Sequence, residues 1–230
     1  MVDRVRVVGA GRVGGAVAAR LRERGLGVRV TGRELDVGGA ELVLLCVPDR
    51  AIAEVAARVE PGPWIAHTSG ATRLSALDPH RRPFSLHPLQ TIVRGRGPEQ
   101  LDGAYAAVSA ETEEALALGF ELARLLGLEP FELDDAERPI YHAGAAIASN
   151  FLVTLHAAAA DLLEAAGAPP EALEPLMRRT IENGFELTGP IARGDWETVE
   201  LHLRAIRARR PQLEPFYRVL ADTTQMLALR

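Results

Sequence analysis

The spacing of hydrophobic residues divides the chain near residue 133. Before that point, short runs rich in β-branched and aliphatic residues alternate with segments of helical period. Several of these runs are apolar at consecutive positions, which is typical of parallel strands covered by helices on both faces. The predicted strands are "RVRVV", "LGVRVT", "ELVLLCV", "WIAHT", "RPFSLH", "AYAAVS" and "LEPFEL".

Strand signals stop at "DDAERP", and the rest of the chain has the pattern of helices separated by turns. The turn sequences are "GAPP", "NGF", "TGPIARGD" and "RRPQLEP". We therefore predict an α/β fold in which a doubly wound sheet over residues 1–133 precedes an all-α domain over residues 134–230. No flexible linker or repeat separates the two, so we expect them to pack directly on one another.

Composition and charge narrow the possible functions. The 230 residues are 47% hydrophobic but only 5% aromatic, which suits a core built of aliphatic side chains. The net charge of −5 disfavours a nucleic acid or an anionic membrane as partner. The chain has no lysine, which excludes a lysine Schiff base or a lysine general acid. The single cysteine, Cys46, lies in the apolar run "LVLLCV", where an inert thiol is expected.

The apolar runs and the first residues of the chain bear on the cellular compartment of the protein. We expect no apolar stretch long enough to span a bilayer, and the first residues enter a strand pattern without a signal-peptide architecture. We expect a cytoplasmic protein.

A glycine motif follows the first predicted strand in "VVGAGRVGGAVAARL", where Gly9, Gly11 and Gly14 form G-x-G-x-x-G. Gly9 permits a tight turn, Gly11 lets a pyrophosphate approach the backbone, and Gly14 lets the helix pack closely on the strand. The N-terminus of that helix faces the phosphates, and Arg12 and Val13 line the same turn. With a strand before it and a helix behind it, the motif predicts a Rossmann dinucleotide site.

The end of the second predicted strand bears on the choice of cofactor. A site for NAD places a carboxylate there to accept a hydrogen bond from the ribose 2′-hydroxyl. This chain instead offers Thr31 and Arg33, a hydroxyl and a guanidinium that suit a 2′-phosphate. The alternative is that Arg33 is a solvated loop residue and that Glu34 or Asp36 binds the ribose. We predict NADP as the cofactor.

Loops that follow later strands are expected to line the same crevice, because ligands of open α/β sheets bind at the carboxyl ends of the strands. Val47 and Pro48 follow the third strand and form part of the cofactor wall. Ser69 and Gly70 bring a hydroxyl and bare backbone to the nicotinamide end. His87 can donate to a substrate oxygen or act as an acid, although before Pro88 it can equally fix a turn.

Two other histidines in this half of the chain are interpreted as noncatalytic. His67 ends a strand and is expected to be a structural histidine. His80, in "LDPHRRP", is expected to be a solvated loop residue.

The loop "TGPIARGD" has two interpretations. Thr188 and Arg193, with the exposed amides around them, can hold a substrate carboxylate. Alternatively the loop only connects helices, with Asp195 as the N-cap of "WETVELHLRAI". The carboxylates of "ELDDAE" have no histidine or cysteine at ligand spacing, so they indicate a helix cap and no metal.

The motifs together resemble a known family. "GAGRVGGAV", "CVPDRAI", "HTSGA", "SLHPLQT", "YHAGAAIASNFL" and "LTGPIARGD" are similar, in this order, to Rossmann-like oxidoreductases that pair an NADP-binding domain with a C-terminal helical domain of unknown function. That family is related to the N-terminal fold of deazaflavin-dependent NADP reductases. It is more distantly related to pyrroline-5-carboxylate reductases and to 6-phosphogluconate and 3-hydroxyisobutyrate dehydrogenases. The resemblance implies NADP-linked redox chemistry and supplies no substrate.

One departure from the hydroxy-acid dehydrogenases is informative. They place a lysine four residues before an asparagine on the first long helix of the second domain, where this chain has Ala146 and Asn150. Lysine-based protonation of a carbonyl therefore does not carry over. Those relatives interlock their helical domains in pairs, which implies a homodimer here. Small residues of the helix predicted over 139–165, such as Ala143 and Gly144, permit close approach of another helix.

The stretch "YHAGAAIASN" supplies the remaining candidates. On a regular α-helix, His142, Ala146, Ser149 and Asn150 share one stripe, with the alanine leaving a notch between polar anchors. We expect this stripe to face the nicotinamide, with His142 as acid or base, Asn150 donating to the substrate and Ser149 nearby. The alternative is that His142 and Asn150 are polar core residues with structural partners.

Two functions remain for the chain. One is an NADP-dependent oxidoreductase acting on a small carbonyl, imine or hydroxy acid between the domains. The other is a noncatalytic NADP(H)-binding sensor or scaffold, which the missing lysine favours.

Overall fold

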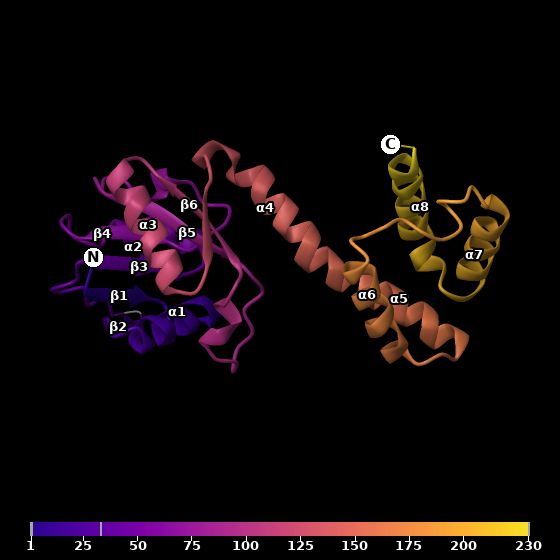
Figure 1. The fold of residues 1–230 in the computed structure, drawn as a ribbon, viewed down its shortest axis with the longest axis horizontal. Helices are drawn as coiled ribbons and strands as arrows, with labels where there is room; N and C mark the ends of the chain where they lie inside the picture. The colour runs from indigo at the N-terminus through magenta and orange to yellow at the C-terminus, as the bar shows by residue number, and fades with distance from the viewer. Residues whose placement is uncertain (1, 33, 230) are drawn as a thin grey trace. The chain divides into compact units, whose positions relative to one another are not determined.

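The computed structural model describes residues 2–32 and 34–229. Contacts between residues divide the chain into two compact units, one ending at Ile147 and the other beginning at Ala148. The first unit contains all the strands of the sheet, and the second is helical (Figure 1).

The first unit is built on a seven-stranded sheet in the order β2-β1-β3-β4-β5-β6-β7. All neighbouring pairs are parallel except β5 and β6, which are antiparallel. The predicted strands and the α/β fold class are confirmed. The strands are β1 (Arg4–Val8), β2 (Gly27–Thr31), β3 (Leu42–Leu45), β4 (Trp64–His67), β5 (Pro83–Leu89), β6 (Tyr105–Ala110) and β7 (Glu129–Glu132).

Helices cover both faces of the sheet, which explains why the central strands are apolar at every position. On one face, α1 (Arg12–Glu23) and α3 (Glu113–Leu125) pack on residues such as Val7 and Leu44. On the other face, α2 (Ile52–Ala56) packs on Val43 and Leu45. Adjacent residues of β3 therefore point into different hydrophobic cores, and each must be apolar.

The strand order places a topological switch point between β1 and β3. The chain leaves β1 toward β2 on one side and continues from β3 to β4 and β5 on the other. These strands are parallel, so β1, β3, β4 and β5 end at the same edge of the sheet, which we call the carboxyl edge. β6 runs the opposite way, with Ala110 opposite Phe84, and so ends at the other edge.

The helix predicted over 139–165 is not regular. α4 (Arg138–Ala146) is followed by a π-helical segment (Ile147–Phe151) and then by α5 (Leu152–Ala166). A π-helix bonds residue i to i+5 and has more residues in each turn than an α-helix. The expected single stripe from His142 to Asn150 assumed a uniform α-helical pitch, which this segment does not have, and the stripe stays a prediction. The boundary between the compact units also falls within the π segment.

One stretch meets the length and hydropathy of a membrane span. The helical segment Asp135–Ala166 has 32 residues and contains an 18-residue window of mean hydropathy 1.4. The expectation that no apolar stretch has this length is wrong. One such helix is weak evidence of a membrane by length and composition alone, and none of the window is buried in the structure.

The second unit consists of helices joined by short turns. After α5 come α6 (Leu173–Glu182), α7 (Trp196–Arg209) and α8 (Glu214–Ala228). Asp195 caps α7 as predicted, accepting a hydrogen bond from the Thr198 amide at 3.1 Å. Glu214 at the start of α8 accepts from Arg207 of α7 at 2.6 Å, which ties these two helices together. Short 3-10 helices occur at Asp49–Ala51, Leu74–Leu77, Pro98–Leu101, Asp135–Glu137, Pro170–Ala172 and Pro211–Leu213.

His80 differs from its expected state. It is 6% exposed, and its Nε2 lies 3.0 Å from the carbonyl oxygen of Ala56. The carbonyl at the end of α2 needs a partner once it is buried, and the imidazole supplies one. His80 is thus a structural histidine of the first unit.

Candidate functional site

The glycine turn has the steric properties that its sequence predicted. Gly9 follows β1 with φ of +109°, and a side chain there would overlap the carbonyl oxygen of Cys46 after β3. A side chain at Gly14 would overlap the Gly9 carbonyl, so α1 packs directly on the turn. A Cβ on Gly11 would meet no atom within 4 Å. The turn is closed toward the protein and open at Gly11, as a phosphate-binding turn requires.

The end of β2 is tied to this turn. The Gly9 amide donates to the Thr31 carbonyl at 2.9 Å, which brings Thr31 beside the glycine motif. Arg33 lies outside the described residues. Arg12 is exposed in the first turn of α1, whereas Val13 packs on the core beneath it. The glycine turn and the end of β2 therefore lie side by side at the carboxyl edge.

The loop after β3 forms the other side of the switch point. Val47 packs into the core, and Pro48 is exposed at the start of a 3-10 turn. Burial raises the pKa of the Cys46 thiol to about 12, so this thiol stays protonated at neutral pH. This loop can therefore line a binding site, but its thiol does not act as a nucleophile.

Ser69 holds the loop after β4 in a tight turn. Its hydroxyl oxygen accepts from the amides of Ala71 and Thr72 and lies 2.9 Å from the Thr72 hydroxyl. The Ser69 amide donates to His67 Nδ1 at 3.2 Å. Ser69 is 7% exposed, and its hydrogen bonds organise the backbone of the loop around Gly70.

Two imidazoles meet over that loop. His87 of β5 and His142 of α4 have ring centroids 6.0 Å apart in an edge-on arrangement. An ideal Cβ on Gly70 would lie 2.6 Å from His142 Cδ2 and 2.9 Å from His87 Nε2. A side chain at position 70 would displace the two rings from these positions, and three segments distant in sequence converge at this point.

Tyr141 extends the group. Its hydroxyl oxygen lies 2.7 Å from His87 Nδ1, and the two rings are nearly perpendicular at 87°. Phe131 of β7 packs edge-on against the tyrosine ring, with centroids 6.1 Å apart. The Tyr141–His87 pair is thus held by β5, β7 and α4 together.

A buried arginine fixes the base of α4. Arg138 has no exposed surface, and its Nε donates to Asp135 Oδ1 at 2.8 Å. Its terminal nitrogens donate to the Ser69 carbonyl and to the Ser109 hydroxyl, both at 2.9 Å. Asp135 also accepts from the Leu74 amide at 3.0 Å. One guanidinium therefore joins α4, the loop after β4 and strand β6.

Burial decides the protonation of this cluster. Burial, and then the neighbouring His142 and Arg138, lower the pKa of His87 to about 4. Burial, and then Arg138, lower the pKa of His67 to about 3. Burial raises the pKa of Tyr141 to about 12, with Arg138 acting in the opposite direction. His87 and Tyr141 are consequently both neutral at pH 7 and form a neutral hydrogen-bonded pair.

Tyr141 and Arg138 were not among the residues singled out in the sequence. Both occur in "DDAERPIYH", whose carboxylates suggested a helix cap. Asp134 does act in that way, accepting from the Ala136 amide, but Asp135 pairs with Arg138 three residues later. An aspartate and an arginine at i and i+3 are a known helix pairing, and that spacing was the available signal.

The other predicted site residues belong to the second unit. Asn150 is exposed and Ser149 half-buried, and both lie in the π segment. Thr188 and Arg193 are exposed in the loop before α7, where the Arg193 amide donates to the Pro190 carbonyl at 3.1 Å. Their participation in a site with the first unit stays a prediction.

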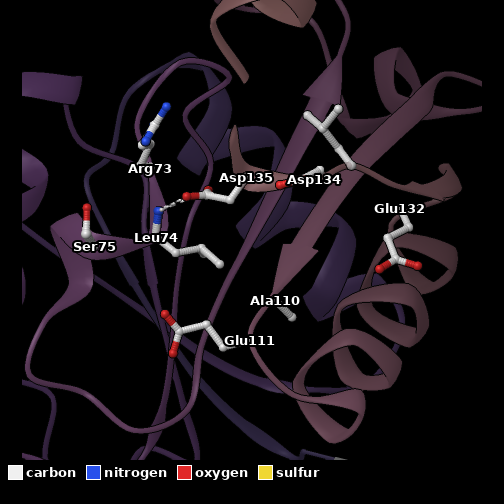
Figure 2. Close-up of a pocket in the computed structure, with 9 residues that line it drawn as sticks. Arg73, Leu74, Ser75, Ala110, Glu111, Glu132, Asp134 and Asp135 are labelled. Carbon is white, nitrogen blue, oxygen red and sulfur yellow. Dashed lines mark hydrogen bonds between the residues drawn. The ribbon is translucent and has the colours of Figure 1, made fainter. Parts of the chain in front are cut away.

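A separate cavity of about 650 Å³ lies in the first unit, near the edge where β6 and β7 end. Figure 2 shows Glu111, Glu132 and Asp134 around it, with Asp135 bonded to the Leu74 amide. None of the site residues predicted from the sequence lines this cavity. Its carboxylates would repel the phosphates of a dinucleotide. This cavity is therefore not a candidate for the cofactor site, and the carboxyl edge is.

The doubly wound sheet and the glycine turn at its switch point define a Rossmann-like protein. The chain belongs to the family of the domain of unknown function DUF2520, whose model matches residues 104–224. The matched segment includes β6, β7 and α4 as well as the helices of the second unit. The resemblance to a Rossmann-like family with a helical domain of unknown function is confirmed.

Solved structures show the same fold. A protein from Bacteroides fragilis, provisionally described as an NADP oxidoreductase, is 23% identical with a TM-score of 0.80, over 97% of this chain and 98% of that one. A protein from Thermotoga maritima is 24% identical with a TM-score of 0.77, over the same fractions. The 1-pyrroline-5-carboxylate reductase of Streptococcus pyogenes is 14% identical with a TM-score of 0.64, over 98% of this chain and 97% of that one. Comparison with curated proteins finds no match.

The burial of His67 predicts a pH dependence of stability. In the unfolded chain its pKa is near 6.5, whereas in the fold it is about 3. Below about pH 6.5 the unfolded state therefore binds a proton that the folded state does not, and the free energy of unfolding falls as the pH falls toward 3. His67→Asn should flatten this dependence by up to about 1.4 kcal/mol per pH unit, measured by urea unfolding between pH 4.5 and 7.5.

The exposed His202 provides the control, because His202→Asn should leave the slope unchanged. If the curves of the wild-type and His67→Asn proteins run parallel over this range, the buried neutral state of His67 is refuted.

Proposed function

We propose that the protein is an NADP-dependent oxidoreductase that transfers a hydride to or from a small carbonyl, imine or hydroxy acid. The observation that carries this proposal is the position of two features at one edge of the sheet. The glycine turn ends β1 at the switch point, and the imidazoles of His87 and His142 meet over Gly70 at the carboxyl ends of β4 and β5. Phosphate binding and proton transfer are the two functions that such an enzyme combines.

The spacing of these features supports the proposal. In the sheet order, β5 is three strands from β1. At about 4.8 Å for each strand, Gly9 and His87 are separated by roughly 14 Å along the edge. A dinucleotide whose pyrophosphate lies at Gly11 extends its nicotinamide half along this edge toward β4 and β5. The hydride would then be exchanged close to Gly70, where the absence of a side chain leaves room.

NADP is the proposed cofactor because β2 ends without a carboxylate. Thr31, beside the glycine turn, has a buried hydroxyl with no hydrogen-bond partner among the described residues. Arg33 follows two residues later in the sequence. A hydroxyl and a guanidinium suit a 2′-phosphate, whereas an acidic side chain would repel it.

His142 is the proposed acid or base, and its neighbour His87 is a second candidate that can donate a proton to the substrate. His142 is exposed on α4, so its imidazole can exchange protons with a bound substrate and with solvent. His87 is half-buried and presents its Nε2 toward Gly70. Ser69 shapes the loop between them and can contribute its backbone to the nicotinamide end. NADPH supplies the hydride, and these side chains supply or remove the accompanying proton.

Residues of the second unit complete the proposed substrate site. Asn150 carries an amide that can donate to the substrate oxygen or nitrogen, with Ser149 as a second polar contact. Thr188 and Arg193 can hold a carboxylate, since both are exposed in a loop with glycines at positive φ on either side. Ala146 has the position of the catalytic lysine of related dehydrogenases, which leaves the proton to histidine.

A homodimer through the helical unit is part of the proposal. Between residues 148 and 229, the side chains that are buried and hydrophobic are only Leu173, Val199, Leu203, Ile206 and Ala221. Large apolar side chains remain exposed on the same unit, including Phe151 at 57%, Val153 at 69% and Phe185 at 72%. A second copy would bury this surface, which is unusually apolar for a monomer.

The first prediction of this proposal concerns the choice of cofactor. The protein should bind NADPH more tightly than NADH, and Arg33→Ala should lower the ratio of affinities by about tenfold or more, because a charge-assisted hydrogen bond contributes roughly 1.5–3 kcal/mol. Fluorescence titration of the bound nicotinamide measures both constants. Arg58→Ala, at an exposed arginine after α2, is the control and should leave the ratio unchanged. Equal affinities for the two cofactors would refute NADP specificity.

The second prediction concerns turnover. Oxidation of NADPH should be measured with cyclohexanone, glyoxylate and 1-pyrroline as a ketone, a 2-oxo acid and an imine. His142→Ala should slow turnover by about 10²- to 10⁴-fold with little change in NADPH affinity, because the lost contribution is proton transfer. The exposed His202 of the second unit is the control, since His202→Ala should retain full activity. NADPH binding without oxidation by any probe would favour a sensor instead.

The third prediction concerns assembly. Light scattering at micromolar concentration should give the mass of two chains, about twice 24.8 kDa. Val153→Glu, at a 69% exposed position of α5, should shift the protein toward monomer because it would bury an unpaired charge. Glu171→Gln, at an exposed polar position of the same unit, should not. A monomeric wild-type protein rules the dimer out.

A further inference from the structure

We propose that Tyr141 is the proton source for His87, and that the two residues form a relay serving substrates whose oxygen or nitrogen must gain a proton as the hydride arrives. The inference rests on the proposed function and deepens it. It selects neutral carbonyl or imine groups as the substrate class over permanently cationic iminium groups, which need no proton.

The geometry defines the two ends of the relay. Tyr141 Oη lies 2.7 Å from His87 Nδ1, within hydrogen-bond distance. The opposite nitrogen, Nε2, faces Gly70, at 2.9 Å from the position that a Cβ there would occupy. Among the described residues, Nε2 has no hydrogen-bond partner. One nitrogen of the ring is therefore committed to Tyr141, while the other faces the proposed nicotinamide end.

The direction of the hydrogen bond follows from the partners available. Within residues 2–32 and 34–229, the only hydrogen-bond partner of the Tyr141 hydroxyl is His87. A half-buried hydroxyl proton without an acceptor carries a desolvation cost, so the tyrosine donates to Nδ1. A neutral imidazole that accepts at Nδ1 carries its proton at Nε2. His87 thus presents an N–H group to the substrate.

The proton steps balance. As the substrate carbon gains a hydride, the His87 Nε2–H bond breaks and an O–H or N–H bond forms on the substrate. At the same time the Tyr141 O–H bond breaks and a proton is added to Nδ1. The imidazole ends neutral in its other tautomer, and the negative charge resides on the tyrosine oxygen until water returns a proton. In the reverse reaction each proton moves the opposite way.

Arg138 offsets part of the cost of the charged intermediate state. It lies three residues before Tyr141 on α4, and its positive charge lowers the pKa of Tyr141 against the effect of burial. Its guanidinium is fully buried and held by Ser69, Ser109 and Asp135, so its position is fixed before any reaction. A fixed positive charge near a developing tyrosinate stabilises it without reorganisation. Arg138 is a positioning residue in this scheme.

A second histidine–tyrosine pair in the chain provides an internal control. In the second unit, His202 Nδ1 lies 2.7 Å from the Tyr217 hydroxyl, and the rings are 5.9 Å apart at 86°. The local geometry matches that of His87 and Tyr141, whose rings are 5.6 Å apart at 87°. His202 is exposed, however, and among the described residues no glycine loop or second imidazole lies against it. Removing the tyrosine hydroxyl from each pair breaks the same kind of hydrogen bond in both. An effect on turnover that only Tyr141 shows therefore comes from the relay.

The test compares Tyr141→Phe with Tyr217→Phe on two probes. Cyclohexanone needs a proton on its oxygen, whereas the N-methyl-1-pyrrolinium cation needs only a hydride. Tyr141→Phe should slow NADPH oxidation by cyclohexanone by about 10- to 100-fold, since solvent replaces the lost donor only in part. It should change the rate with the cation less than twofold, and Tyr217→Phe should change neither. Equal slowing on both probes, or none on cyclohexanone, overturns the relay.

A measurement without turnover separates this inference from the proposed function. Nitrogen NMR of histidine-labelled protein, with His87 assigned from His87→Gln, reports which ring nitrogen carries the proton at pH 7. The relay requires the Nε2–H form in the wild type, and a dominant Nδ1–H form overturns it. If no probe oxidises NADPH, the proposed function fails, and the tautomer still decides the inference: the Nε2–H form sustains the donor assignment.

Discussion

The first unit depends on one buried guanidinium. Arg138 is surrounded by the Ser69 carbonyl, the Ser109 hydroxyl and the Asp135 carboxylate, which satisfy its donors where water cannot. An uncompensated buried charge costs several kcal/mol, so these partners are obligatory once Arg138 is inside. They also fix the position of α4 on the sheet. The meeting of His87, Tyr141 and His142 over Gly70 depends on that position, since two of the three side chains project from α4.

Local patterns in the sequence were sufficient for the sheet and for the glycine turn. Alternating strand and helix periods are local, and the steric need for glycine at Gly9 and Gly14 follows from a known turn. The arrangement around Gly70 was harder to predict, because it joins residues about seventy positions apart. Nothing in "IYHAG" indicates that Tyr141 turns toward β5 or that Arg138 reaches β6. Such contacts depend on the angle at which a helix packs, which periodicity does not encode.

The π segment is a second feature that the sequence pattern did not predict. A helical wheel assumes a constant pitch, and on that assumption His142 and Asn150 share a stripe. The extra residue in the turn at Ile147–Phe151 breaks the assumption, although the composition of the segment is ordinary for an α-helix. π-helical turns in α-helices often accompany functional sites. Asn150 is in this turn, so the irregular backbone and a proposed substrate contact coincide.

Because α4 belongs to the unit that carries the sheet, the position of a junction matters when parts of such proteins are recombined. The strands end at Glu132, yet α4 contacts β5, β6 and the loop after β4, and the compact unit continues to Ile147. The DUF2520 match begins earlier still, at residue 104, within the sheet. A chimaera joined at the last strand would separate Arg138 from Ser69 and Ser109 unless both halves came from compatible parents. A segment that keeps Arg138 together with its partners must therefore include the sheet and α4.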